Sequence, residues 1–103
     1  MKFNILTEEG PISIPIIEKF THKGRVLVFH RAFRRNELAV ILHSVSDFKT
    51  GLEIANGTKE NVYFKAIDAI DNRFDNELAF NNYFINEFID ETVNLENHDT
   101  TEL

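Results

Sequence analysis

The alternation of apolar and polar positions in the first half of the chain predicts a series of short strands. Four segments rich in β-branched and large apolar residues carry this pattern: 12–20 (ISIPIIEKF), 25–31 (RVLVFHR), 38–45 (LAVILHSV) and 52–55 (LEIA). Glycine-containing turn signals separate them. Because proline has no N–H to donate to a ladder, we expect the first strand to lie at an edge or to bend at Pro15.

The apolar residues of segment 59–74 have the spacing of a helix, and Thr58 is the expected N-cap of this helix. At about 100° per residue the apolar side chains fall on one continuous arc. They are Val62, Tyr63, Ala66, Ile67, Ala69, Ile70 and Phe74. We therefore predict a helix that packs this arc against the sheet.

A second helix is predicted at residues 76–93, and its apolar side chains spread over about half of its circumference. They include Leu78, Phe80, Phe84, Ile85, Phe88 and Ile89. A helix this apolar is either buried on several sides or faces a second molecule. We expect Phe80, Phe84 and Phe88 to form an apolar surface for a partner or a homodimer. The alternatives are a helix whose apolar side chains are all buried in the core of its own chain, or a strand at 83–89 in place of the helix.

The two strongest strands predict a hairpin with its turn between Arg34 and Arg35, which places Leu27 opposite Leu42. Both faces of this hairpin are then largely apolar, so both need covering. The helix at 59–74 covers one face, and the second helix, the N-terminal segment or another subunit covers the other. The predicted fold class is α+β, with a small antiparallel sheet of three to four strands followed by two C-terminal helices. Residues 1–93 form one domain, and 94–103 form an acidic flexible tail.

The formal net charge of −6 is divided unevenly along the chain. Residues 1–67 hold ten Lys and Arg against seven Asp and Glu, whereas residues 68–103 hold one Arg against ten acids. This asymmetry indicates two surfaces with separate partners, or two patches that attract each other. The acids of the two helices form a row that could imitate a phosphate backbone: Asp68, Asp71, Asp75, Glu77, Glu87, Asp90 and Glu91. The alternative is the ordinary solvent-facing side of two helices.

Positive charge gathers at residues 29–37 (FHRAFRRNE), the tip of the predicted hairpin. We expect Arg31, Phe33, Arg34 and Arg35 to bind a partner there, because guanidinium groups match phosphate or carboxylate and an aromatic ring can stack or fill a pocket. The target is an acidic protein surface or nucleic acid. A sequence pI of about 5.1 makes nucleic acid the weaker of the two. The alternative is a solubilising tip with its ring folded back onto the sheet.

Enzymatic and metal-dependent functions receive little support from the composition. There is no cysteine, and the histidines His22, His30, His43 and His98 lack the spacing of metal ligands. Ser44 and Ser46 near His43 lack a nucleophile-elbow motif. We therefore predict a non-enzymatic protein without cofactor or metal, soluble and cytoplasmic, and without a membrane span.

Residues 43–70 (HSVSDFKTGLEIANGTKENVYFKAIDAI) place a Thr-Gly turn before a short strand and open a helix with Gly-Thr-Lys-Glu. This pattern resembles small, mostly uncharacterised bacteriophage and mobile-element proteins. The resemblance implies a phage accessory protein, such as an anti-CRISPR-like inhibitor of a bacterial nucleic-acid-directed enzyme, and assigns no functional residue. The hypothesis is thus a protein-interaction module that binds a host protein. The alternatives are a nucleic-acid-binding or regulatory protein and a homodimeric structural domain.

Overall fold

The computed structural model describes residues 1–87 of the chain. Its elements, in chain order, are β1 (Lys2–Thr7), β2 (Gly10–Pro15), β3 (Glu18–His22), β4 (Arg25–Arg34), β5 (Glu37–Asp47), β6 (Glu53–Gly57), α1 (Val62–Arg73) and α2 (Glu77–Glu87). The expected tail at 94–103 and the end of the second predicted helix lie outside the described residues.

The strands form two antiparallel sheets. Strands β3, β4, β5 and β6 pair in chain order in a four-stranded sheet, and β1 pairs with β2 in a separate hairpin. The predicted α+β class is confirmed, with both helices after the strands. The extra two-stranded sheet was not predicted. Residues 12–20 supply two strands in different sheets. The Ile16 amide still donates to the Met1 carbonyl at 2.8 Å, whereas the Ile17 amide already donates to the Phe29 carbonyl of β4 at 2.9 Å.

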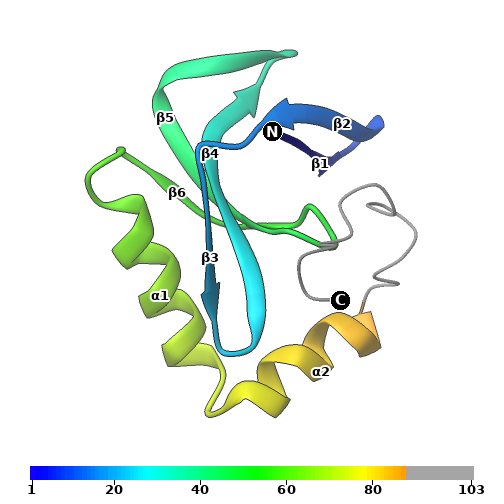
Figure 1. Ribbon diagram of the computed structural model, residues 1–103, viewed down its shortest axis with the longest axis vertical. Helices are drawn as coiled ribbons and strands as arrows, with labels where there is room; N and C mark the ends of the chain where they lie inside the picture. Colours follow the sequence, from blue (N-terminus) through cyan, green and yellow to red (C-terminus); the bar gives the residue numbers. More distant parts are fainter. Residues whose placement is uncertain (88–103) are drawn as a thin grey trace.

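The molecule has three layers, with the β1–β2 hairpin and the two helices on opposite sides of the four-stranded sheet (Figure 1). Alternate residues of β4 point to opposite layers, as the pleat of a strand requires. Thus Leu27 and Phe29 belong to the core between the sheet and the helices. Val28 belongs to the core between the sheet and the β1–β2 hairpin, called here the core beneath the hairpin. The prediction of two apolar sheet faces is confirmed, and the N-terminal segment covers the second.

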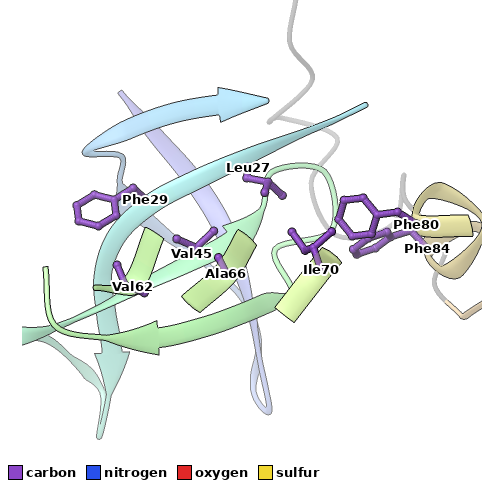
Figure 2. Packing of buried hydrophobic residues seen from close by; sticks show 8 residues of the cluster. All are labelled: Leu27, Phe29, Val45, Val62, Ala66, Ile70, Phe80 and Phe84. Atoms are coloured by element: carbon purple, nitrogen blue, oxygen red, sulfur yellow. The ribbon is translucent and has the colours of Figure 1, made fainter. Parts of the chain in front are cut away.

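Figure 2 shows the core between the sheet and the helices. Its buried members are Leu27, Phe29, Val45, Val62, Ala66, Ile70, Phe80 and Phe84. The core beneath the hairpin consists of Phe3, Ile5, Ile14, Val28 and Phe48. Burial of each of the larger side chains stabilises the fold by about 1.5–3 kcal/mol before the entropy of ordering is subtracted.

The predicted register of the β4–β5 hairpin was wrong. The two-residue turn is Arg35–Asn36, with φ of 53° and 65°, and it pairs Arg34 with Glu37. Positive φ at both central residues is the type I′ geometry that suits the twist of a hairpin. The register then shifts at a bulge in which residues 39–42 of β5 oppose a single residue of β4. Beyond the bulge Leu27 lies opposite Asp47.

Helix α1 begins later than predicted. Its N-cap is Asn61, and residues 59–61 form a preceding turn in which the Asn61 side chain accepts a hydrogen bond from the Thr58 amide at 3.0 Å. The buried face is made by Val62, Ala66 and Ile70, spaced four residues apart. The helix itself is as predicted, but its buried stripe is narrower than the predicted arc, because Tyr63 and Ala69 are exposed.

A buried ion pair joins the start of β4 to the end of β5. Arg25 donates from Nε to Oδ1 of Asp47 at 2.6 Å and from Nη2 to Oδ2 at 3.0 Å. Asp47 also accepts hydrogen bonds from the amide and hydroxyl of Thr50. The guanidinium lies 3.9 Å from the ring centroid of Phe84, so this pair also anchors α2.

Candidate functional site

A cleft of about 560 Å³ opens between the turn of the β1–β2 hairpin and the tip of the β4–β5 hairpin. A volume of this size is in the range of small-molecule sites. Three groups of lining residues define it: a floor of His30 and Ser46, a side formed by Arg34 and Glu53, and a rim formed by the two turns.

The floor of the cleft is a hydrogen-bonded pair. His30 Nδ1 lies 2.8 Å from the carbonyl oxygen of Arg31, which can only accept, so Nδ1 carries the proton. Burial lowers the pKa of His30 and keeps the imidazole neutral, although the bond to the Arg31 carbonyl acts in the opposite direction. Nε2 therefore accepts a hydrogen bond from the Ser46 hydroxyl, at 2.8 Å.

This pair has the spacing of a serine nucleophile and its base. Ser46 and His30 are only 1% and 2% exposed, however, so a substrate has almost no access to the hydroxyl. The two side chains form the floor of the cleft, and each provides the hydrogen-bond partner of the other. Sequence reasoning missed it because the wrong register placed His30 opposite Ala39, whereas it lies opposite Ser44.

Arg34 is held against one side of the cleft by Glu53 on β6. Its Nη2 donates to both carboxylate oxygens, at 3.0 and 3.1 Å. Burial opposes the charge on Glu53, but hydrogen bonds from Ser44 and Arg34 outweigh it and lower the pKa of this carboxyl. Arg34 therefore has a fixed position and a neutralising partner, in contrast to the free reach expected of it.

The other residues predicted at the tip lie in three different environments. Arg31 donates from Nε to the Ala39 carbonyl at 2.6 Å and from Nη2 to the Leu38 carbonyl at 3.4 Å. It thereby stabilises the bulge, and its role in partner binding stays a prediction. Phe33 is half-buried against the core beneath the hairpin, which matches the alternative of a ring folded back onto the sheet. Arg35 is exposed at the rim of the cleft.

The bulge exposes two adjacent apolar side chains. Val40 is 80% exposed and Ile41 is 77% exposed. The sequence did not reveal this exposure, because the five consecutive apolar positions of residues 38–42 (LAVIL) are also typical of a strand that is buried on both faces. We call Val40 and Ile41 the bulge pair.

The acidic row is partly engaged within the molecule. Asp71 accepts hydrogen bonds from Lys23 and His22, and these bonds, the one from Lys23 first, lower the pKa of its carboxyl. The Glu77 side chain lies against Gly24 of the same β3–β4 turn. Two of the predicted acids therefore surround this turn, while Asp68 and Asp75 are exposed. The side chain of Glu87 and the residues Asp90 and Glu91 lie outside the described part of the chain.

The predicted apolar partner surface on the second helix is corrected. Phe80 and Phe84 are each 1% exposed and belong to the core beneath the helices (Figure 2). They lie four residues apart on α2, so both point to the same side, where they meet the end of α1. Phe88 lies outside the described residues. Leu78, in the first turn of α2, is 68% exposed.

Within residues 1–87 no helix is long and apolar enough to span a membrane. The same part of the chain contains no cluster of three or more His, Asp or Glu side chains that could hold a metal ion. Comparisons with protein families, with curated proteins and with solved structures found no match to this chain. A function for this protein is therefore inferred from the geometry of its own residues.

Proposed function

We propose that this protein is a non-enzymatic protein-interaction module that binds its partner through the distal part of the β4–β5 hairpin. The observation that carries the proposal is the bulge pair. Val40 and Ile41 are adjacent and apolar, and they are 80% and 77% exposed, whereas Val45 of the same strand is fully buried. Isolated apolar residues on a surface are ordinary, but a rigid exposed pair supplies a contact that a partner can bury.

The bulge gives this surface a defined shape before any partner binds. Arg31 fixes the carbonyls of Leu38 and Ala39, and the ring of His43 lies 2.9 Å from the Ile41 carbonyl through Nδ1. Because little order has to be gained on binding, most of the apolar contact contributes to affinity. Full burial of the pair corresponds to about 1.5–3 kcal/mol for each side chain.

The partner that we propose is a bacterial nucleic-acid-directed enzyme, inhibited by this chain as a phage accessory protein. The acidic balance of the chain supports this choice, which also follows the resemblance to phage proteins expected for residues 43–70. Exposed carboxylates such as Asp68 and Asp75 attract a basic groove and steer association with it. Direct binding of nucleic acid is less well supported, because Arg31 and Arg34 are already bound within the molecule.

The test is affinity capture from a bacterial lysate, with and without nuclease, followed by mass spectrometry. We expect a stoichiometric protein that survives nuclease and is lost with the double variant Val40→Ser, Ile41→Ser. Leu78→Ser is the matched control, since it removes an equally exposed apolar side chain from α2 and should leave capture unchanged.

Three results would contradict the proposal. Capture that disappears with nuclease would favour nucleic acid as the ligand. Sedimentation of the wild-type chain as a dimer that the double variant abolishes would assign the bulge pair to self-association. An equal loss of partner capture with Leu78→Ser would show that the bulge pair has no special role in binding.

A further inference from the structure

The two turns at the rim of the cleft carry opposite charges. The β1–β2 turn contributes Glu8 and Glu9, and the β4–β5 turn contributes Arg35 beside the neutralised Arg34. All four side chains belong to exposed residues. In the part of the chain that the structure describes, no ion pair joins the two turns across the opening. Positive and negative groups thus face one cleft from opposite sides.

Between these turns the cleft offers an apolar surface and an uncharged floor. Ile5, Ile12 and Phe33 line it beside the neutral pair of His30 and Ser46. An apolar portion of a ligand can lie there without leaving a charged group unpaired. The rim of the cleft therefore carries a negative and a positive side, and the interior is lined by apolar or uncharged groups.

We propose that this cleft binds a small zwitterionic molecule of the amino-acid class, with its carboxylate at Arg35, its ammonium group at Glu8 and Glu9, and its side chain inside. This site is distinct from the bulge pair, since neither Val40 nor Ile41 lines the cleft. The inference therefore does not depend on the proposed function.

Charge complementarity selects a zwitterion over a simple anion or cation. The charged lining groups are two arginines, of which Glu53 already neutralises one, and the two glutamates of the opposite turn. An anion alone would be attracted by Arg35 and repelled by both glutamates, whereas a cation alone would be attracted by both glutamates and repelled by Arg35. A ligand with both charges satisfies both turns, and a polyanion such as nucleic acid is disfavoured.

The experiment is an NMR titration of the ¹⁵N-labelled full chain with L-leucine. We expect shifts in the amides of Glu8, Arg35 and Gly51, all at the cleft. Isoamylamine lacks the carboxylate and 4-methylpentanoate lacks the ammonium group, and each should bind at least about tenfold more weakly, since a lost charge-assisted hydrogen bond corresponds to about one power of ten.

Variants locate the two charges. Arg35→Gln should weaken L-leucine by about tenfold, and Glu8→Gln combined with Glu9→Gln should weaken it by a similar factor. Lys59→Gln is the matched control, because it removes an exposed charge outside the cleft and should leave affinity unchanged. Val40→Ser, Ile41→Ser should also leave it unchanged, which separates this site from the partner surface.

Several outcomes would overturn the inference. One is the absence of shifts with leucine, phenylalanine, lysine and aspartate at millimolar concentration. Another is equal binding of the two single-charge analogues. A third is wild-type affinity in both Arg35→Gln and the double glutamate variant, which would place the ligand elsewhere.

Discussion

Burial decides the protonation state of His30, and with it the structure of the cleft floor. A protonated imidazole would donate from both nitrogens, so Nε2 could no longer accept the Ser46 hydroxyl. The neutral ring instead satisfies both neighbours and lies 5.2 Å from the ring of Phe3, centroid to centroid. One titratable side chain thus connects the core beneath the hairpin to the floor of the site.

We expect the free energy of unfolding to fall as the pH decreases through about 6.5. Histidine in the unfolded chain takes up a proton there, whereas burial lowers the pKa of His30 in the fold and keeps it neutral. The unfolded state then binds more protons, so acid destabilises the fold, by at most about 1.4 kcal/mol per pH unit for one group. Above pH 6.5 both states are neutral and this contribution to the pH dependence vanishes.

Urea denaturation between pH 7.5 and 5.5 measures this dependence. His30→Gln removes the titrating group, and its free energy of unfolding should therefore vary less with pH than that of the wild type, whatever its absolute stability. Equal slopes in the two proteins would contradict a neutral buried His30.

Individual side-chain roles were the least predictable from the sequence. Arg31 and Arg34 have the same chemistry as Arg35, yet two of the three bind within the molecule because of a bulge and a neighbouring strand. Those partners are distant in the sequence or depend on the exact register. Phe80 and Phe84 illustrate the same limit, because periodicity shows that a helix face is apolar but does not show what covers it.

At the scale of elements, the β3–β4 turn gathers contacts from both helices. Asp71 of α1 binds Lys23, and Asn81 of α2 donates to the Lys23 carbonyl at 3.1 Å. Lys23 and Gly24 have φ of 47° and 78°, again the type I′ geometry. A lysine in this left-handed conformation is strained, and the surrounding contacts hold it there.

Lys23→Asn should stabilise the protein by about 1 kcal/mol. Asparagine followed by glycine is the preferred type I′ sequence, and relief of the left-handed lysine corresponds to about 1–2 kcal/mol. The lost ion pair with the exposed Asp71 contributes little, and His22 still binds this carboxylate. The midpoint of urea denaturation measures the gain.

Gly24→Ala, at the next residue of this turn, should have the opposite effect on stability and serves as a control. A Cβ at Gly24 would collide with the Glu77 side chain, and alanine does not favour a φ of 78°. It should destabilise the fold. A Lys23→Asn protein less stable than the wild type would show that the contact with Asp71 outweighs the turn.

Element existence was more predictable than element position. The apolar periods correctly indicated the existence of α1, α2, β4, β5 and β6, because each pattern depends on local spacing. The register was missed because a two-residue turn at Arg35–Asn36 and a bulge at 39–42 leave almost no trace in an apolar run. The cleft was not predictable, since it lies between two turns whose approach depends on that register.

At the scale of the whole molecule, the three layers depend on one another. Phe3 of β1 stacks on Phe48, at 6.3 Å between ring centroids, and lies over the sheet face opposite the helices. A hairpin of two strands is only marginally stable alone. The β1–β2 layer and the sheet should therefore unfold together.

Phe3→Ala should destabilise the entire domain by about 3–5 kcal/mol, because it leaves a cavity in a buried site. The loss should appear in the helical circular-dichroism signal during denaturation, although Phe3 contacts the layer opposite the helices. Leu6→Ala, at a more exposed position of β1, is the control and should cost much less. An unchanged helical transition in Phe3→Ala would show that the hairpin unfolds separately.

The β1–β2 hairpin precedes the residues that it packs against, and this order has a consequence for synthesis on the ribosome. Phe3, Ile5 and Ile14 emerge before Val28 and Phe48, which cover them. Until β4 and β5 have been translated, the hairpin has no surface on which to bury its rings and aliphatic chains. The β1–β2 hairpin therefore reaches its final place only after strands that follow it in the sequence have been made.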